Sequence, residues 1–149
     1  MVERISWDQY FMEIAKTASK RASCFRGKKV GAVLVKDKQI LATGYNGAPK
    51  GVQNCLELDY CIRQKKELES GKRLEFCRAT HAEQNAIAQA AFQGVATKGA
   101  VLYTTTFPCI LCAKLLINAG IKEIVFQEEE KDELSKGILE EAKVKIRKL

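Results

Sequence analysis

The sequence has little of several features that mark other classes of protein. It contains one histidine, His81, so a Ser-His-Asp or Cys-His nucleophilic system would have to use that residue. Aromatic residues make up only 7% of the chain, which disfavours binding of single-stranded nucleic acid through stacked bases. The longest strongly apolar uncharged stretch, near residues 99–107, is far shorter than the ~20 residues of a membrane span. Residues 1–14 include acidic and basic side chains where a signal peptide is apolar, so we expect a cytoplasmic protein with no membrane association.

What remains is the composition of one globular domain. The chain has 149 residues, of which 46% are hydrophobic and 29% charged, and it shows no internal repeat or low-complexity tract. A chain of this length buries roughly 68–70% of its unfolded surface. We therefore predict a single domain over residues 1–149, with a cysteine-rich insertion at about 52–79. The net charge of +7 is concentrated in residues 16–38, a distribution that suits an anionic small molecule, nucleic acid or an ordinary solvated surface.

Hydrophobic periodicity predicts helices that alternate with strands. The expected helices are residues 7–18 behind a Ser6 capping box, a short one near 58–69, 82–92, one opened by Pro108 and ended by Gly120, and 133–142. The expected strands are a hairpin of 30–35 and 40–43, then 100–105, 123–126 and a terminal strand. The glycine-rich stretch 44–51 is predicted to be a loop. This order indicates an α/β sandwich with a mixed sheet.

Two short motifs carry the candidate chemistry. His81 and Glu83 begin one predicted helix, and Cys109 and Cys112 begin another. Because the two cysteines are three residues apart, their sulfurs project from one helix face, and a helix N-terminus favours the metal-binding thiolate. One histidine and two cysteines make a three-ligand zinc site, which leaves a fourth position where zinc can supply hydroxide near neutral pH. Glu83 is placed to act as the general acid and base.

The combination of His-x-Glu with a later Pro-Cys-x-x-Cys is the signature of zinc-dependent nucleobase deaminases. The stretches CFRGKKVGAV, GYNGAP, HAEQNAI and PCILCAK resemble deoxycytidylate deaminases of the cytidine deaminase superfamily; they occupy residues 24–33, 44–49, 81–87 and 108–114. The resemblance extends over nearly the whole chain. It implies a cytidine deaminase-like, three-layer α/β/α sandwich with a mixed five-stranded sheet.

The same resemblance implies hydrolysis of dCMP to dUMP and ammonia, which supplies dUMP for thymidylate synthesis. His81, Cys109 and Cys112 would hold the catalytic zinc, zinc hydroxide would attack C4 of the pyrimidine, and Glu83 would shuttle protons. Asn46 would help to hold the nucleotide, although loop asparagines often cap their own turn. No organic cofactor is required.

The resemblance and the positive charge together predict which ligands the protein binds and how it assembles. Arg26 is the preferred phosphate contact among Arg26, Lys28 and Lys29, which are otherwise surface charges. Members of the family are commonly homo-oligomeric and are often activated by dCTP, here expected with Mg²⁺, and inhibited by dTTP. The candidate effector loop consists of Gly44, Tyr45, Asn46 and Gly47.

Four further cysteines bracket the irregular insertion and lie outside the catalytic motif: Cys24, Cys55, Cys61 and Cys77. Four thiolates satisfy tetrahedral zinc, and a second, structural zinc would fasten a segment that has few apolar residues. Some relatives carry such an ion. The alternative is that Cys24 and one or two of the others are small buried hydrophobic residues.

Two other functions are compatible with the motifs. One is a related deaminase that acts on tRNA adenosine or on another nucleobase, against which stand the cysteine-rich insertion and the few aromatic residues. The other is a non-catalytic zinc module, in which the cysteines and His81 bind zinc only to stabilise the fold. Substitution of Glu83 distinguishes that module from an enzyme.

Overall fold

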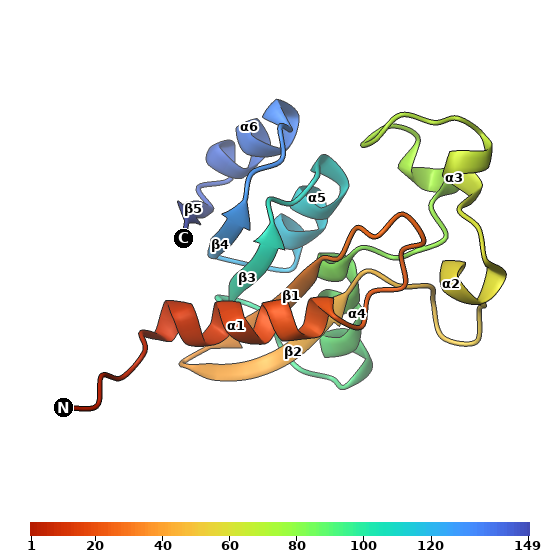
Figure 1. Cartoon of the computed structure of the whole chain (residues 1–149). Helices are drawn as coiled ribbons and strands as arrows, with labels where there is room; N and C mark the ends of the chain where they lie inside the picture. Colours follow the sequence, from red (N-terminus) through yellow and green to blue (C-terminus); the bar gives the residue numbers. More distant parts are fainter.

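The five strands form one mixed sheet in the order β2-β1-β3-β4-β5 (Figure 1). In the computed structural model, which describes all 149 residues, the strands are β1 (Gly31–Lys36), β2 (Gln39–Tyr45), β3 (Val101–Thr106), β4 (Glu123–Glu128) and β5 (Lys145–Lys148). β1 pairs antiparallel with β2 and β3, whereas β3, β4 and β5 are parallel. The central strands β1 and β3 are buried along nearly their whole length because both faces of the sheet are covered. The predicted mixed five-stranded sheet is confirmed.

Helices cover both faces of this sheet. The longer ones are α1 (Trp7–Ser19), α4 (Ala82–Phe92), α5 (Ile110–Asn118) and α6 (Glu133–Glu141). α1 buries Phe11, Met12 and Ala15 against one face, in a cluster with Val33 and Tyr103. The other face carries the larger core, to which α4, α5 and α6 contribute. The molecule is therefore the three-layer sandwich that the resemblance implied.

The insertion departs from the prediction of one helix at 58–69. It contains α2 (Cys55–Leu58), α3 (Ile62–Lys65) and the 3-10 turn η1 (Leu74–Phe76). Asn54 caps α2, and Asp59 ends it with a left-handed φ of 59° that a continuous helix does not allow. The buried Arg63 of α3 donates to the carbonyls of Glu69 and Lys72, which follow the helix. The insertion is thus shaped by local polar contacts, which hydrophobic periodicity does not report.

The loop predicted to start at Gly44 starts later. Gly44 and Tyr45 are the last residues of β2, and Gly44 pairs with Ala32 of β1. A Cβ on Gly44 would lie 2.1 Å from the carbonyl oxygen of Ala82, so this glycine is required by the close approach of α4 and not by a turn. Only Asn46 and Gly47 of the four candidate effector residues lie in the loop that follows the strand.

Asp8 joins α1 to the far edge of the sheet. Its carboxylate accepts hydrogen bonds from the Tyr103 hydroxyl at 2.8 Å and from both terminal nitrogens of Arg147 at 2.8 and 3.1 Å. These bonds with Arg147 hold the pKa of Asp8 below its ordinary value. A carboxyl whose pKa is lowered by folding stabilises the protein above its unfolded pKa, and that contribution is lost as the pH falls through the folded value.

We expect Asp8→Asn to lower the free energy of unfolding at pH 7 by about 1–2 kcal/mol, because charge-assisted hydrogen bonds at a partly exposed site are lost. The variant should also lose less stability than the wild type as the pH falls below the ordinary aspartate pKa of 3.8. Urea denaturation across this pH range measures both effects. Glu69→Gln removes a carboxylate from a fully exposed pair with Lys72 and serves as the control without effect. Parallel pH curves for Asp8→Asn and the wild type would contradict the assignment.

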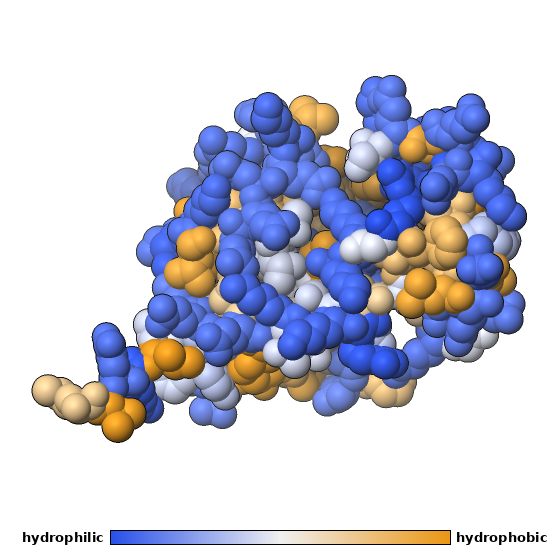
Figure 2. All heavy atoms as spheres, in the orientation of Figure 1, coloured by the Kyte–Doolittle hydropathy of each residue, from blue (hydrophilic) through white to orange (hydrophobic).

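No helix has both the length and the apolar composition that crossing a membrane requires. Hydrophilic side chains dominate the face of the molecule seen in Figure 2, with hydrophobic residues between them.

Candidate active site

Three side chains converge at the N-termini of α4 and α5. His81 Nδ1 lies 3.5 Å from Cys109 Sγ and 3.4 Å from Cys112 Sγ, and the three ligand atoms are all within 4.8 Å of one another. A zinc ion with ordinary bond lengths and tetrahedral angles would place its nitrogen and sulfur ligands about 3.6 Å apart. The donor set and its spacing therefore fit zinc, as the motif predicted.

Local chain geometry explains this convergence. His81 is the N-cap of α4, and its backbone N–H donates to the side-chain oxygen of Gln84. The imidazole is therefore free to face the cysteines. Cys109 is the N-cap of α5, and Cys112 lies in its first turn. The prediction that Pro108 occupies the first helical position was wrong, because α5 begins at Ile110. Pro108 instead ends the connection from β3 and fixes the direction from which the chain enters the helix.

Glu83 lies beside these ligands in the first turn of α4. The residue is only 4% exposed, and its carboxylate is 3.6 Å from Cys112 Sγ. Burial raises the pKa of Glu83 because the charged form is poorly solvated. A carboxyl with this placement and a raised pKa can both accept and return a proton near neutral pH.

The pKa values of the two thiols are shifted in opposite directions. The hydrogen bond from Cys112, together with bonds from His81 and from the Cys112 N–H, lowers the pKa of Cys109 to about 4. The hydrogen bond between the two sulfurs, together with burial, raises the pKa of Cys112. The hydrogen bond between His81 and Cys109 raises the pKa of His81. The site therefore holds one thiolate ready for a cation, and binding a metal displaces the remaining protons.

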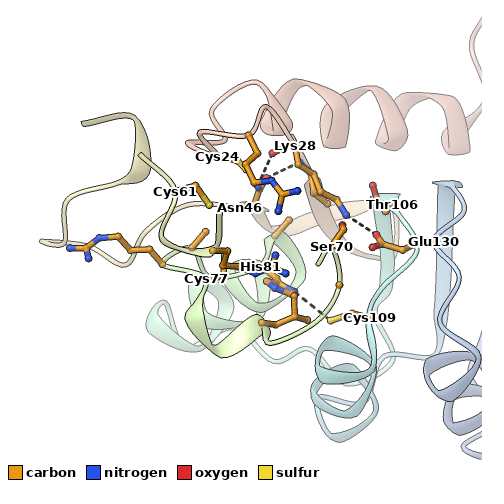
Figure 3. Close-up of a pocket in the computed structure, with 18 of the residues that line it drawn as sticks. Cys24, Lys28, Asn46, Cys61, Ser70, Cys77, His81, Thr106, Cys109 and Glu130 are labelled. Carbon is orange, nitrogen blue, oxygen red and sulfur yellow. Dashed lines mark hydrogen bonds and ion pairs between the residues drawn. The ribbon is translucent and has the colours of Figure 1, made fainter. Parts of the chain in front are cut away.

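A cavity of about 370 Å³ leads to these residues. Its wall is formed by the chain before β1, the loop after β2, the insertion, and the segment between β4 and α6; Figure 3 shows His81 and Cys109 among the residues that line it. Basic side chains line it as well, namely Arg26, Lys28, Arg63, Arg78 and Lys131. The volume and the mixed polar and apolar lining are typical of a small-molecule site, here with positive charge that suits an anionic ligand.

Comparison with known proteins agrees with this geometry. Residues 5–128 match the family model described as the cytidine and deoxycytidylate deaminase zinc-binding region. The chain belongs to this family. The match includes both motifs of the site, so the family predicted from them is confirmed.

Relatives within the deaminase family include proteins of different lengths. The deoxycytidylate deaminase of Schizosaccharomyces pombe is 41% identical over 97% of this chain, and that of mycobacteriophage D29 is 39% identical over 86%. The chain spans 44% of the length of the yeast protein, less than half, but the match covers 99% of the phage protein. Among solved structures, the dCMP deaminase of cyanophage S-TIM5 in complex with dCMP and dUMP superposes with a TM-score of 0.80 at 28% identity, covering 99% of this chain and 100% of that one.

In this family member, Asn46 and Lys28 line the cavity with their polar groups already engaged. Asn46 accepts a hydrogen bond from the Val30 N–H at 2.7 Å and donates to the Lys28 carbonyl at 2.9 Å. Lys28 Nζ forms an ion pair with Glu130 at 2.8 Å, drawn as a dashed line in Figure 3. Asn46 thus ties the loop after β2 to the chain before β1 and does not cap its own turn, and one amide hydrogen remains for a ligand.

The four other cysteines line the same cavity. Cys55 and Cys61 are buried, and all four are free. Burial raises the pKa of Cys55, and so do the neighbouring Cys61, Cys77 and Cys24. The fold has therefore brought together cysteines that are up to 53 positions apart in the sequence. Their sulfurs do not converge as the ligand atoms of His81, Cys109 and Cys112 do, which lie within 4.8 Å of one another.

Two cavity residues, Glu130 and Asp132, gave no signal that sequence reasoning recognised. They follow β4 in an acidic run, which usually indicates a solvated surface. Glu130 pairs with Lys28, and Asp132 accepts a hydrogen bond from Ile110 N. The position of Asp132 as an N-cap candidate before α6 was the one feature that could have drawn attention to it.

Proposed function

We propose that this protein is a zinc-dependent hydrolase that converts dCMP to dUMP and ammonia. The observation that carries the proposal is the buried Glu83 carboxylate beside a three-ligand set of His81, Cys109 and Cys112. The family match, the phage deaminase of nearly equal extent and the relative bound to dCMP and dUMP support the choice of substrate.

A zinc ion held by the three ligands supplies a water of lowered pKa and thereby the attacking hydroxide. Glu83 accepts the proton that this water loses and passes it to N3 of the cytosine ring while oxygen forms a bond to C4. Glu83 would then take the proton of the new C4 hydroxyl and give it to the amino group, so that the C4 carbonyl forms as the C4–N bond breaks and ammonia leaves. Glu83 is only 4% exposed, which limits the access of bulk water to the carboxyl group while it carries each proton.

Substrate selection follows from the charge of the cavity. Arg26 lines it and has no acidic partner among the ion pairs, so we assign this guanidinium to the nucleotide phosphate. Lys28 is already paired with Glu130, and Lys29 does not line the cavity. Asn46 would use its remaining amide hydrogen for the sugar or the base.

Ammonia release from purified protein tests the proposal. The substrates are dCMP, CMP, deoxycytidine and dCTP, each assayed alone and with added dCTP or dTTP in the presence of Mg²⁺. We expect dCMP to be the preferred substrate. Absence of ammonia from dCMP under every condition refutes the function.

The phosphate contact has its own test. We expect Arg26→Gln to raise KM for dCMP by roughly 10- to 100-fold, because a charge-assisted hydrogen bond is lost, and to leave the weak use of deoxycytidine unchanged. Lys29→Gln removes an adjacent positive charge outside the cavity and should leave both KM values near the wild type. Equal losses for dCMP and deoxycytidine would remove Arg26 from the phosphate site.

We also propose that Cys24, Cys55, Cys61 and Cys77 hold a second, structural zinc, supported by their common position on the cavity wall. Elemental analysis of purified protein should then find two zinc ions per chain. Cys61→Ser should reduce this number to one and lower the melting temperature, whereas Cys112→Ser should remove the other ion and abolish turnover. One zinc in the wild type would eliminate the structural site.

The remaining parts of the proposal concern context. The protein would form a homo-oligomer in the cytoplasm and supply dUMP for thymidylate synthesis. Its activator would be dCTP and its inhibitor dTTP. The effector arms of the ammonia assay and the mass of the purified protein in solution test them.

A further inference from the structure

We propose that Asp132 and Ser135, at the start of α6, are positioning residues that hold the turn of residues 108–112 so that Cys109 faces His81. The inference rests on the metal site of the proposed function and adds two residues to it. Neither residue contacts the ligand set directly, and both act through the backbone on either side of Cys109.

Asp132 connects the starts of two helices with one carboxylate. As the N-cap of α6, it accepts a hydrogen bond from the Ser135 N–H through Oδ1 at 2.9 Å. Its other oxygen, Oδ2, accepts the Ile110 N–H at 2.8 Å. Ile110 is the first residue of α5, and its N–H has no acceptor within that helix. The carboxylate therefore satisfies a donor that would otherwise lack a partner and fixes α5 relative to α6.

Ser135 holds the same turn from the other side of Cys109. Its side chain is fully buried, and its hydroxyl donates to the Pro108 carbonyl at 2.6 Å. One residue earlier, the Phe107 N–H donates to the Glu128 carbonyl of β4. The backbone is thus bonded at residues 107, 108 and 110, and these bonds set the direction in which the Cys109 side chain leaves the chain.

The placement matters because thiolate ligands must meet a metal at defined distances and angles. The Cys112 N–H donates to the Cys109 sulfur, and this bond forms only when the turn keeps its present shape. An N-cap needs a single acceptor oxygen, so the second oxygen of Asp132 is not explained by capping α6. Partners that orient metal ligands in this way typically contribute 10- to 100-fold to metal affinity or activity.

The test measures zinc affinity and cobalt spectra of the full-length protein. Asp132→Asn keeps the size and the capping ability of the residue but leaves one acceptor oxygen for two N–H donors. Asp132→Ser also caps a helix, and its short side chain cannot reach Ile110 as well. Ser135→Ala removes the bond to Pro108. We expect each variant to bind zinc 10- to 100-fold more weakly in competition with a chromophoric chelator.

Cobalt provides the readout that a purely structural role would not change. The thiolate-to-cobalt charge-transfer band and the d–d bands report ligand geometry, and we expect both to shift in the Asp132 variants. With zinc saturating, kcat of Ser135→Ala should fall while its KM for dCMP stays near the wild-type value, because Ser135, unlike Asp132, does not line the cavity.

Ser6→Ala is the matched control. Ser6 caps α1 on the opposite face of the sheet and accepts a hydrogen bond from the Gln9 N–H at 3.2 Å, so its loss lowers stability without touching the site. It should leave zinc affinity and the cobalt spectrum unchanged. Wild-type affinity and spectra in both Asp132 variants overturn the inference, as does an equal loss of affinity in Ser6→Ala.

Failure of the proposed function would give a different result from failure of the positioning role. A wild type that binds zinc and deaminates dCMP, with Asp132 variants that behave identically, overturns the positioning role alone. A wild type that binds no zinc overturns both.

Discussion

Replacing Glu83 with glutamine is expected to lower kcat by about 10²- to 10⁴-fold, the usual contribution of a general acid and base. The amide has the shape of the carboxyl group but cannot take up the proton that the attacking water loses. Zinc content should remain at the wild-type value, because Glu83 is not one of the three ligands. The melting temperature should be at least that of the wild type, since an ionisable group that is 4% exposed becomes neutral.

Single-turnover kinetics, elemental analysis and thermal denaturation of the same preparation measure these three quantities. Glu13→Gln, which neutralises an exposed carboxylate of α1, controls for the change in net charge. If Glu83→Gln retains wild-type turnover, the carboxylate does not shuttle protons. If neither protein turns over any substrate while both bind zinc, the chain is the non-catalytic zinc module that the motifs also allow.

Gly44→Ala should have the largest effect on stability of any single methyl addition on the site side of the sheet. The added Cβ would lie 2.1 Å from the Ala82 carbonyl oxygen and 2.6 Å from the Ala86 nitrogen. Both atoms belong to the backbone of α4, so the clash cannot be relieved by rotating a side chain. We expect a loss of about 3 kcal/mol or more in the free energy of unfolding. Because α4 carries Glu83 and His81 is its N-cap, the folded fraction should also lose turnover and zinc affinity.

Denaturant titration, with kcat measured per folded molecule, checks both consequences. Gly137→Ala is the control, since nothing lies within 4 Å of a Cβ at this exposed position in α6. It should raise stability by about 0.5–1 kcal/mol through helix propensity and leave kcat unchanged. A Gly44→Ala protein with wild-type stability would mean that α4 and β2 are not packed backbone to backbone.

The limits of sequence reasoning are clearest at Gly44 and Asp132. A glycine in a run rich in glycine and proline is typical of a loop, yet Gly44 ends a strand because a helix backbone passes over it. An aspartate after three glutamates is typical of a solvated surface, yet Asp132 bonds to the first residue of α5, 22 positions earlier. Both roles depend on neighbours that are distant in sequence, and no local pattern contains them.

The motifs were predictable because their spacing is local. Two cysteines three apart at a helix start face one point, and a glutamate two residues after a histidine lies in the same first turn; these relations follow from helix geometry alone. The alternation of apolar segments likewise indicated an α/β sandwich with a mixed sheet, whereas the three layers and five strands were implied by the family resemblance. By itself, then, the amino-acid sequence determined which residues are the candidate ligands, which is the candidate acid and base, and what architecture holds them. Only the tertiary structure decided that His81 meets Cys109 across 28 positions, that the insertion closes the cavity, and that α6 holds the cysteine turn, because contacts between distant segments depend on how the layers pack.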